Sequence, residues 1–298
     1  MPWLEMKLDV HPDNAEEFEQ LLMEAGASAV TLEDGADQPL FEPELGSTPL
    51  WDQTRITGLF EAGADLAQVR RQLESGHAEV APGTPFPPCK VEILEDKDWE
   101  REWMDNFHPM QFGPRLWVCP SWKPVADPDA ANLMLDPGLA FGTGTHPTTA
   151  LCLEWLATLP LEGATVLDYG CGSGILGIAA LLLGAKRLIA TDIDPQALEA
   201  TEQNAARNQI DPGRLELYYP RQLPEVEADV LVANILAGPL VELAPELATR
   251  VRPGGRLALS GVLSSQQTAL EQAYLPWFDL DAPVAREEWI RLTGTRLR

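Results

Sequence analysis

The sequence predicts an α/β protein in which a smaller α+β domain precedes a doubly wound, mainly parallel sheet of seven strands. Three observations predict this fold. Strand-like and helix-like segments alternate from about residue 130 onward, as they do in parallel sheets. A glycine-rich turn at residues 168–174 joins an apolar strand to a helix. Residues 1–95 contain elements in the order β-α-β-β-α-β, the split βαβ arrangement of ferredoxin-like domains.

Residues 1–95 are the first predicted domain. Residues 3–10 alternate apolar and polar side chains, as in a half-buried strand. Further strands are predicted at residues 29–32, 55–61 and 90–94, and helices at residues 12–25 and 65–74. Four prolines within residues 81–88 predict a surface loop before the last strand.

Residues 96–126 are predicted to be a linker. Its charged stretch at residues 98–106 is expected to be a helix, with Trp99 and Trp103 on one face that docks on a domain. Residues 112–122 are expected to form a short β-hairpin that leads into the second domain.

Residues 127–298 are the second predicted domain. Its strands are expected at residues 166–169, 188–191, 215–218, 229–233 and 256–259, with helices at 174–183, 195–207, 240–250 and 265–273. Two further strands at residues 278–282 and 289–296 have no helix between them, so they are expected to pair antiparallel.

The glycine-rich turn predicts a nucleoside cofactor. Gly170, Gly172 and Gly174 allow a sharp turn and close approach to a ligand, and the next helix offers unpaired N–H groups. Asp192 ends the following strand, where a carboxylate can accept both hydroxyls of a ribose. Residues 172–177 fit the dinucleotide pattern G-x-G-x-x-G, whereas the frame from Asp168 fits D-x-G-x-G-x-G. The extra carboxylate suits the ammonium group of S-adenosylmethionine and would repel a pyrophosphate, so we favour that cofactor over NAD.

Two further segments are predicted to complete the site. Asn234 follows the strand at residues 228–233, so it should lie beside the glycine loop, where its amide oxygen can accept a hydrogen bond from a substrate amine. Capping of the helix that begins near Pro239 is the alternative role. In residues 141–149, Thr145 or His146 is expected to cap a helix, with Thr149 one turn further. The free amides and hydroxyls there predict a carboxylate pocket, in which His146 could also act as a base.

The sequence resembles the PrmA family. The resemblance is carried by the motifs above together with residues 95–103, 135–141 and 234–240, and it covers the whole chain. Members of this family methylate protein eleven of the large ribosomal subunit in bacteria. The resemblance implies an N-terminal substrate-recognition domain, a linker and a class I methyltransferase domain. It also implies methylation of lysine side chains and of the α-amino group, with cofactor contacts at Thr149, Gly170, Asp192 and Asn234. No Asn-Pro-Pro-aromatic sequence occurs at Asn234, which fits an aliphatic amine.

Charge restricts the partners. The chain has 21 basic and 46 acidic residues, a net charge of −25. Residues 1–100 hold six basic and 22 acidic residues, a net −16, and the other 198 residues hold 15 and 24, a net −9. Such a protein is a poor ligand for nucleic acid and attracts basic partners, which favours a basic protein substrate.

Other features predict a cytoplasmic monomer that contacts neither a membrane nor nucleic acid directly. No secretory signal and no apolar run near 18 residues is present. The four cysteines at 89, 119, 152 and 171 lack C-x-x-C spacing, and the predicted chemistry requires no metal.

The predicted reaction is methyl transfer from S-adenosylmethionine to an amine, with Asn234 as the catalytic residue. Its cofactor site is predicted to comprise Thr149, Asp168, Gly170, Gly172, Asp192 and Asn234. Two alternatives remain open at this stage: an NAD-dependent oxidoreductase, and a non-catalytic acidic binding protein that keeps a relic cofactor site.

Overall fold

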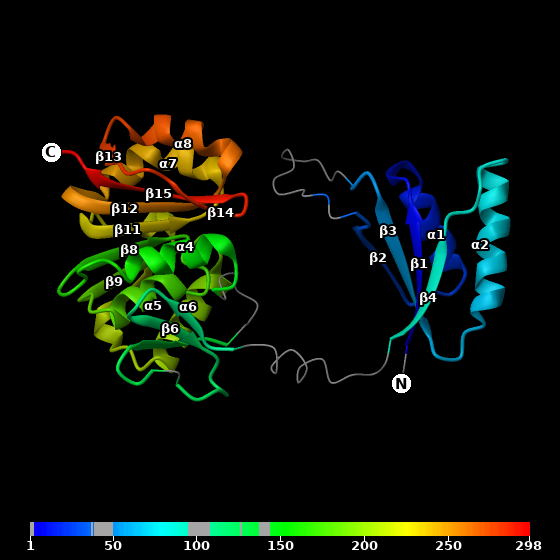
Figure 1. The fold of residues 1–298 in the computed structure, drawn as a ribbon, viewed down its shortest axis with the longest axis horizontal. Coiled ribbons are helices and arrows are strands. Elements are labelled where there is room, and N and C mark those ends of the chain that lie inside the picture. Colours follow the sequence, from blue (N-terminus) through cyan, green and yellow to red (C-terminus); the bar gives the residue numbers. More distant parts are fainter. Residues whose placement is uncertain (1–2, 37, 39–49, 95–107, 126, 137–143) are drawn as a thin grey trace. The chain divides into compact units, whose positions relative to one another are not determined.

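The structure, a computed structural model, describes residues 3–36, 38, 50–94, 108–125, 127–136 and 144–298. The chain divides into two compact units, Met1–Met104 and Asp105–Arg298 (Figure 1). Each unit has a hydrophobic core of its own. The expected linker helix at residues 98–106, with Trp99 and Trp103, lies outside the described residues, and the boundaries predicted at residues 95 and 126 stay predictions.

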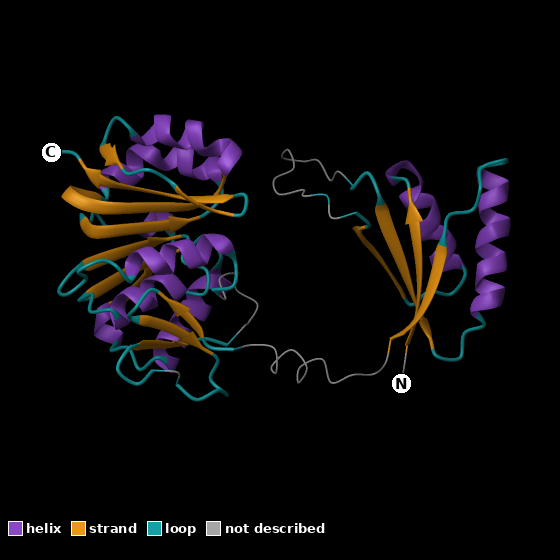
Figure 2. Ribbon diagram, viewed as in Figure 1, coloured by secondary structure: helices purple, strands orange, loops and turns teal. Residues whose placement is uncertain are grey.

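The first unit is a four-stranded antiparallel sheet with two helices packed on one face (Figure 2). Along the chain its elements are β1 (Trp3–Val10), the 3₁₀ turn η1 (Pro12–Asn14), α1 (Ala15–Glu24), β2 (Ala29–Asp34), β3 (Thr54–Glu61), α2 (Leu66–Val80) and β4 (Cys89–Leu94). The spatial order is β2-β3-β1-β4, with every neighbouring pair antiparallel. Alternation along β1 directs Met6 and Leu8 toward Phe18 and Leu73 of the helices. The predicted split βαβ arrangement is therefore confirmed.

Helix α2 extends six residues beyond the predicted end at residue 74. Gly76 lowers helix propensity, which favours an earlier end in sequence-based reasoning. In the structure a Cβ at position 76 would overlap the Leu21 side chain of α1, so the glycine allows the two helices to approach closely. Next to this contact, the His77 ring nitrogen Nδ1 lies 2.8 Å from Oε1 of Glu17, one turn before Leu21 in α1. Tertiary packing therefore extends the helix past its glycine.

The second unit is built on an eight-stranded sheet. Its strands are β8 (Thr165–Tyr169), β9 (Arg187–Thr191), β10 (Leu215–Tyr218), β11 (Ala228–Asn234), β12 (Val251–Leu263), β13 (Phe278–Leu280), β14 (Val284–Arg286) and β15 (Trp289–Arg296). Seven of them follow the order β10-β9-β8-β11-β12-β15-β13, and β14 pairs with β15. The first five are parallel, and β15 runs antiparallel between β12 and β13. The predicted doubly wound sheet and its antiparallel terminal pair are confirmed.

The count of seven strands is corrected to eight in the described part of the chain. The additional strand, β14, has three residues that are exposed or half-buried. Such a short segment shows no apolar alternation, so no sequence pattern could predict it.

Helices cover both faces of this sheet (Figure 2). Helices α4 (Pro147–Leu156), α5 (Ile175–Leu182) and α6 (Pro195–Arg207) pack on one face, and α7 (Ala237–Thr249) and α8 (Gln267–Tyr274) on the other. Because both faces of the sheet are covered, β8 and β11 are buried almost throughout instead of alternating between buried and exposed positions. Three short 3₁₀ turns, Pro212–Arg214, Pro220–Gln222 and Ser264–Gln266, complete the connections.

A small sheet precedes the large one. It contains β5 (Met110–Phe112), β6 (Leu116–Cys119) and β7 (Ala131–Met134). Strands β5 and β6 form an antiparallel hairpin, near the one expected at residues 112–122, and β7 pairs with β6 in parallel. Phe112, Leu116 and Val118 belong to the same core as α4 and α5. This hairpin therefore packs as part of the second unit.

Candidate functional site

The predicted site residues follow three neighbouring parallel strands. Strands β9, β8 and β11 lie side by side and end at Thr191, Tyr169 and Asn234. The residues that follow these strands therefore emerge at the same edge of the sheet, the carboxyl edge, where ligands of doubly wound sheets bind. The predicted positions at Gly170, Asp192 and Asn234 all lie at this edge.

The glycine loop is shaped by packing as well as by room for a ligand. Gly170, Gly172 and Gly174 all have positive φ, at 78°, 55° and 78°. A Cβ at Gly170 would overlap Cγ2 of Ile235, and a Cβ at Gly174 would lie 2.7 Å from Cγ2 of Thr201. The loop is held to β9 because the Gly170 N–H donates to the Thr191 carbonyl at 2.8 Å. Glycines 170 and 174 are thus required by the fold before any ligand is considered.

Asp192 links the loop to the end of β9. Its Oδ2 accepts from the Gly172 N–H at 2.9 Å, and its Oδ1 accepts from the Asp194 N–H at 3.0 Å. Each carboxylate oxygen retains a further lone pair for a ribose hydroxyl. Ile193, the next residue, is 84% exposed. An isoleucine so exposed beside a polar site suits contact with an apolar ligand face, and sequence reasoning missed it because one apolar residue in a loop has no periodic signal.

Asp168 lies beneath the loop and is fully buried. Its Oδ2 accepts from the Gly177 N–H in the first turn of α5 at 2.8 Å. Its Oδ1 is buried and has no hydrogen-bond partner among the described residues. Burial raises the pKa of Asp168 to about 7, an effect that the Gly177 bond opposes and that the charge of Asp192 reinforces. The carboxyl group therefore anchors α5 and keeps one polar atom unused.

Asn234 and Thr149 are brought together from segments 85 residues apart. The Asn234 Nδ2 donates to the Thr149 Oγ1 at 3.3 Å, which joins the end of β11 to the first turn of α4. Thr149 is fully buried. The amide oxygen of Asn234 is buried without a hydrogen-bond partner in the part of the chain that the structure describes. Helix α7 has no side-chain cap and its N-cap residue is Leu236, so the alternative role of Asn234 as a helix cap is wrong.

His146 is the N-cap of α4. Its Nδ1 accepts from the Thr148 N–H at 3.4 Å and lies 2.8 Å from the Thr148 hydroxyl oxygen. The cap bond implies that the proton of the neutral ring is on Nε2, so the nitrogen that could accept a proton already serves the cap. Burial lowers the pKa of His146, against the opposing effect of Glu287 and Glu288. These contacts favour the capping role over the role of a base. Residues 141–143 of the predicted pocket lie outside the described residues.

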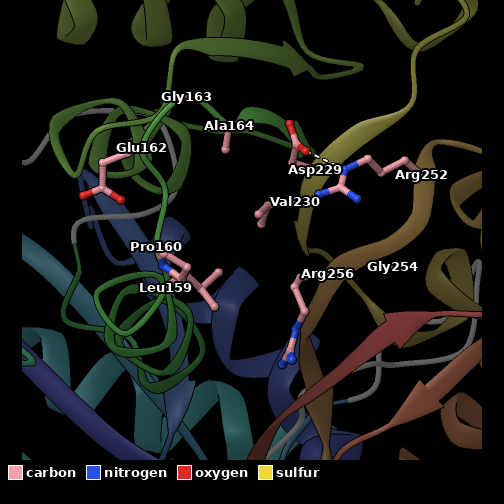
Figure 3. A pocket seen from close by; sticks show the side chains of 10 residues that line it. All are labelled: Leu159, Pro160, Glu162, Gly163, Ala164, Asp229, Val230, Arg252, Gly254 and Arg256. Atoms are coloured by element: carbon pink, nitrogen blue, oxygen red, sulfur yellow. Dashed lines mark hydrogen bonds and ion pairs between the residues drawn. The ribbon is translucent and has the colours of Figure 1, made fainter.

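A hollow of about 290 Å³ lies at the opposite, amino edge of the sheet (Figure 3). It is lined by residues around the starts of β8, β11 and β12, and Asp229 pairs there with Arg252 at 2.5 Å. The Asp229 Oδ2 also accepts from the Thr165 N–H at 2.8 Å. None of the predicted site residues lines this hollow, so it is separate from the candidate site.

The described residues offer neither a membrane-spanning helix nor a metal-binding cluster. Within those ranges, no helix is both long and apolar enough to cross a bilayer. The same ranges contain no group of three or more His, Cys, Asp or Glu side chains placed to hold a metal ion.

The fold and the site define the class of the protein. The strand order with an antiparallel β15, the glycine loop, Asp192 at the tip of β9 and Asn234 at the tip of β11 are those of a class I methyltransferase dependent on S-adenosylmethionine. The residues fit this cofactor: Asp192 suits its ribose, Ile193 an apolar face, and the Asp168 carboxyl oxygen that has no hydrogen-bond partner among the described residues suits one of its polar groups.

Comparisons with known proteins narrow the class to a family. The family model described as "Ribosomal protein L11 methyltransferase (PrmA)" matches residues 2–297. The "Ribosomal protein L11 methyltransferase" of Marinomonas sp. (strain MWYL1) is 55% identical over 296 residues, which are 99% of each chain. The protein of the same name from Pseudomonas fluorescens (strain SBW25) is 58% identical over 296 residues, 99% of this chain and 100% of that one.

A solved structure agrees with this assignment. The crystal structure of "ribosomal protein L11 methylase" from Lactobacillus delbrueckii subsp. bulgaricus is 34% identical, with a TM-score of 0.58. It covers 64% of this chain and 99% of its own. The chain belongs to the ribosomal protein L11 methyltransferase (PrmA) family. This membership confirms the predicted resemblance and does not favour either alternative, the NAD-dependent oxidoreductase or the relic binding protein.

Proposed function

We propose that this protein transfers methyl groups from S-adenosylmethionine to amino groups of ribosomal protein L11, at lysine side chains and at the N-terminal α-amine. The observation that carries this proposal is at Asn234, whose side-chain nitrogen donates to Thr149 while its buried amide oxygen has no hydrogen-bond partner among the described residues. An unpaired buried acceptor is costly, so a ligand that donates a hydrogen bond is expected to satisfy it.

The principal chemical task for the protein is to present a neutral amine. S-adenosylmethionine, when bound, supplies a methyl group already activated by its sulfonium. A lysine amine has a pKa near 10.4, so only about one in 2,500 is neutral at pH 7. A neutral acceptor such as the Asn234 amide favours the neutral amine, whereas a carboxylate at the same place would favour the ammonium ion. Asn234 is therefore proposed to accept one amine hydrogen and to orient the nitrogen lone pair.

The cofactor contacts are proposed for residues that the fold gathers at the carboxyl edge. Asp192 accepts from the ribose hydroxyls, and Ile193 contacts the apolar face of the base. The loop at Gly170 and Gly172 provides the close approach. The unpartnered oxygen of Asp168 is proposed to compensate the cofactor ammonium, and Thr149 is proposed to hold Asn234 against the cofactor.

We propose that one unit recognises the substrate and the other carries out the methyl transfer. The first unit recognises the substrate, because residues 1–100 have a net charge of −16 and ribosomal proteins are basic. The second unit, from about Asp105, is the catalytic domain, since β5 and β6 pack in its core. We further propose that the protein acts in the cytoplasm as a monomer and contacts neither nucleic acid nor a membrane directly.

A methylation assay with ribosomal protein L11 tests both the substrate and the atoms that are modified. The full chain is incubated with purified ribosomal protein L11 and isotopically labelled cofactor, and the products are mapped by mass spectrometry. Label on lysine and α-amino nitrogens is expected. Label only on other atoms, or none with folded and cofactor-binding protein, would contradict the proposal.

Asn234 is tested by two variants. Asn234→Ala should lower kcat by about 10²-fold at saturating cofactor, the scale for loss of one preorganised polar group. Asn234→Asp should recover activity only at high pH, because its carboxylate favours the protonated amine. If Asn234→Asp matched the parent enzyme from about pH 7 to 10, the neutral acceptor would be wrong.

A further inference from the structure

Ile235, the residue that follows Asn234, lies between two glycines, Gly170 and Gly261. On the side of β8, the Ile235 side chain fills the space where Gly170 lacks a Cβ. On the side of β12, a Cβ at Gly261 would collide with the Ile235 carbonyl oxygen, and it would lie 2.8 Å from the carbonyl carbon and 3.1 Å from the nitrogen. Cβ atoms do not approach backbone so closely, so Gly261 is in contact with the main chain of Ile235 itself.

Gly261 lies in a bulge at the end of β12. Along β15, pairing moves from Leu292 to Ile290, while along β12 it moves from Leu259 to Val262. Strand β12 thus contains one residue more than its partner at this point, and Gly261 adopts a φ of 82°. The buried Ser260 hydroxyl donates to the Ile290 carbonyl at 2.9 Å and fixes the bulge to β15.

The bulge lies at the point where β11 leaves the sheet. The last pair between β11 and β12 joins Asn234 to Ser260, so Ile235 and Gly261 are the first residues beyond the ladder. The Ile235 nitrogen belongs to the peptide that follows Asn234. A shift of this peptide would therefore also shift the Asn234 amide and its bond to Thr149.

We infer that Gly261 is a positioning residue for the methyl-transfer reaction: the bulge at the tip of β12 sets the path of Ile235 and thereby the orientation of Asn234. This inference rests on the catalytic role proposed for Asn234. Gly261 itself contributes no side chain to the site, and it acts by allowing contact between two backbones. No sequence motif singles it out, because its partner is 26 positions away and meets it only across the sheet.

The experiment compares three glycine variants of the full chain. Gly261→Ala should lower kcat for methylation of ribosomal protein L11 by about tenfold or more at saturating cofactor, since small displacements in a catalytic site have large effects on rate. Gly254→Ala is the matched control for backbone strain, because Gly254 lies in the same strand with a φ of 75° and only Arg252 Nη1 at 3.9 Å from its would-be Cβ. Gly238→Ala adds a methyl to open space just after the catalytic turn. Both controls should keep kcat within about twofold of the parent.

A double variant shows whether the effect passes through Asn234. Gly261→Ala should lower kcat much less in an Asn234→Ala background than in the parent, because coupled residues are not additive. An equal loss in both backgrounds, or an unchanged kcat for Gly261→Ala while Asn234→Ala is impaired, would overturn the inference alone. A parental kcat for Asn234→Ala would overturn the proposed catalytic role together with the inference.

Melting curves confirm that each variant is folded. If Gly261→Ala does not fold, Ser260→Ala takes its place in both comparisons, because it removes the side-chain bond from the bulge to β15 without adding volume. A loss of kcat for Ser260→Ala that disappears in the Asn234→Ala background supports the inference. An unchanged kcat overturns it.

Discussion

At the scale of single residues, Asp192 has a structural task, and we propose that it also binds the cofactor. The carboxylate accepts two backbone N–H groups, from Gly172 and Asp194, and so closes the glycine loop onto the end of β9. Its remaining lone pairs face the carboxyl edge, where we propose the ribose. Asp194, two residues further, offers a comparison because its Oδ1 caps α6 through the Gln196 N–H at 2.9 Å and we propose no cofactor contact for it.

The first prediction separates these tasks. Asp192→Ala should weaken S-adenosylmethionine binding by about 30- to 150-fold, or ~2–3 kcal/mol, through loss of charge-assisted hydrogen bonds. Asp194→Ala, the matched control, should lower the melting temperature through loss of its cap while affinity stays near that of the parent. Isothermal calorimetry measures both affinities. Equal cofactor affinity in Asp192→Ala and the parent would remove Asp192 from the site.

The second prediction concerns the pH dependence of stability at Asp168. Burial raises its pKa to about 7, far above the value of about 3.9 in an unfolded chain. Between these values the folded state retains a proton that the unfolded state releases, so this group makes stability fall as pH rises. Asp168→Asn removes the ionisation and keeps an oxygen for the Gly177 N–H. The melting temperature of the variant relative to the parent should therefore rise from about pH 4 to 7 and level off at higher pH. A constant difference would contradict the raised pKa.

At the scale of elements, the first turn of α4 joins two parts of the site. His146 caps the helix, and Thr149 within the same turn accepts from Asn234. The His146 ring also meets Trp289, the first residue of β15, with ring centroids 5.0 Å apart. The cap therefore helps to fix the position in which Thr149 contacts Asn234 at the end of β11.

The third prediction tests His146 as a cap. His146→Ala should destabilise the protein by about 1 kcal/mol, and His146→Asn should recover most of this loss because asparagine is a good N-cap. Since burial lowers the folded-state pKa of His146, the stability it provides is full above about pH 6.5 and falls as pH falls below that value. His146→Asn should lose this acid sensitivity. Its kcat should stay near the parental value, and a loss of about 10²-fold would instead assign His146 the role of a base.

At the scale of the whole molecule, charge and cofactor residues are separated along the chain. The net charge of residues 1–100 is −16, whereas every proposed cofactor contact follows residue 144. Each unit has its own core, so each is expected to keep its fold when separated.

The fourth prediction uses this separation. A fragment of residues 105–298 should bind S-adenosylmethionine as the full chain does and lose most methylation of intact ribosomal protein L11. The start at Asp105 retains β5 and β6, whose Phe112, Leu116 and Val118 are part of the hydrophobic core of the second unit. For the full chain, the KM for this basic substrate should rise with salt because steering between charged proteins is screened. Full activity of the fragment on the intact substrate would show that the first unit is not needed for recognition.

Local patterns were sufficient to predict most elements and the outline of the site. Three local patterns carried this prediction: the alternation in β1, the apolar runs of β8 and β11, and the glycines around Cys171. Each depends on residues only a few positions apart, so it can be recognised in the sequence. The position of Asp192 at a strand tip followed from the same run of residues. These features come from short-range sterics and from the periods of strands and helices.

The tertiary structure decided everything that depends on distant contacts. It extended α2 past Gly76 by packing against α1, placed β5 and β6 in the second unit, and formed β14 from three residues without a pattern. It also brought Thr149 to Asn234 across 85 positions and Gly261 to Ile235 across the sheet. The sequence by itself thus determined the order of elements, the cofactor class and the charge of the two units. Only the folded chain determined which backbones touch, because those contacts arise from the packing of strands and helices that no local pattern encodes.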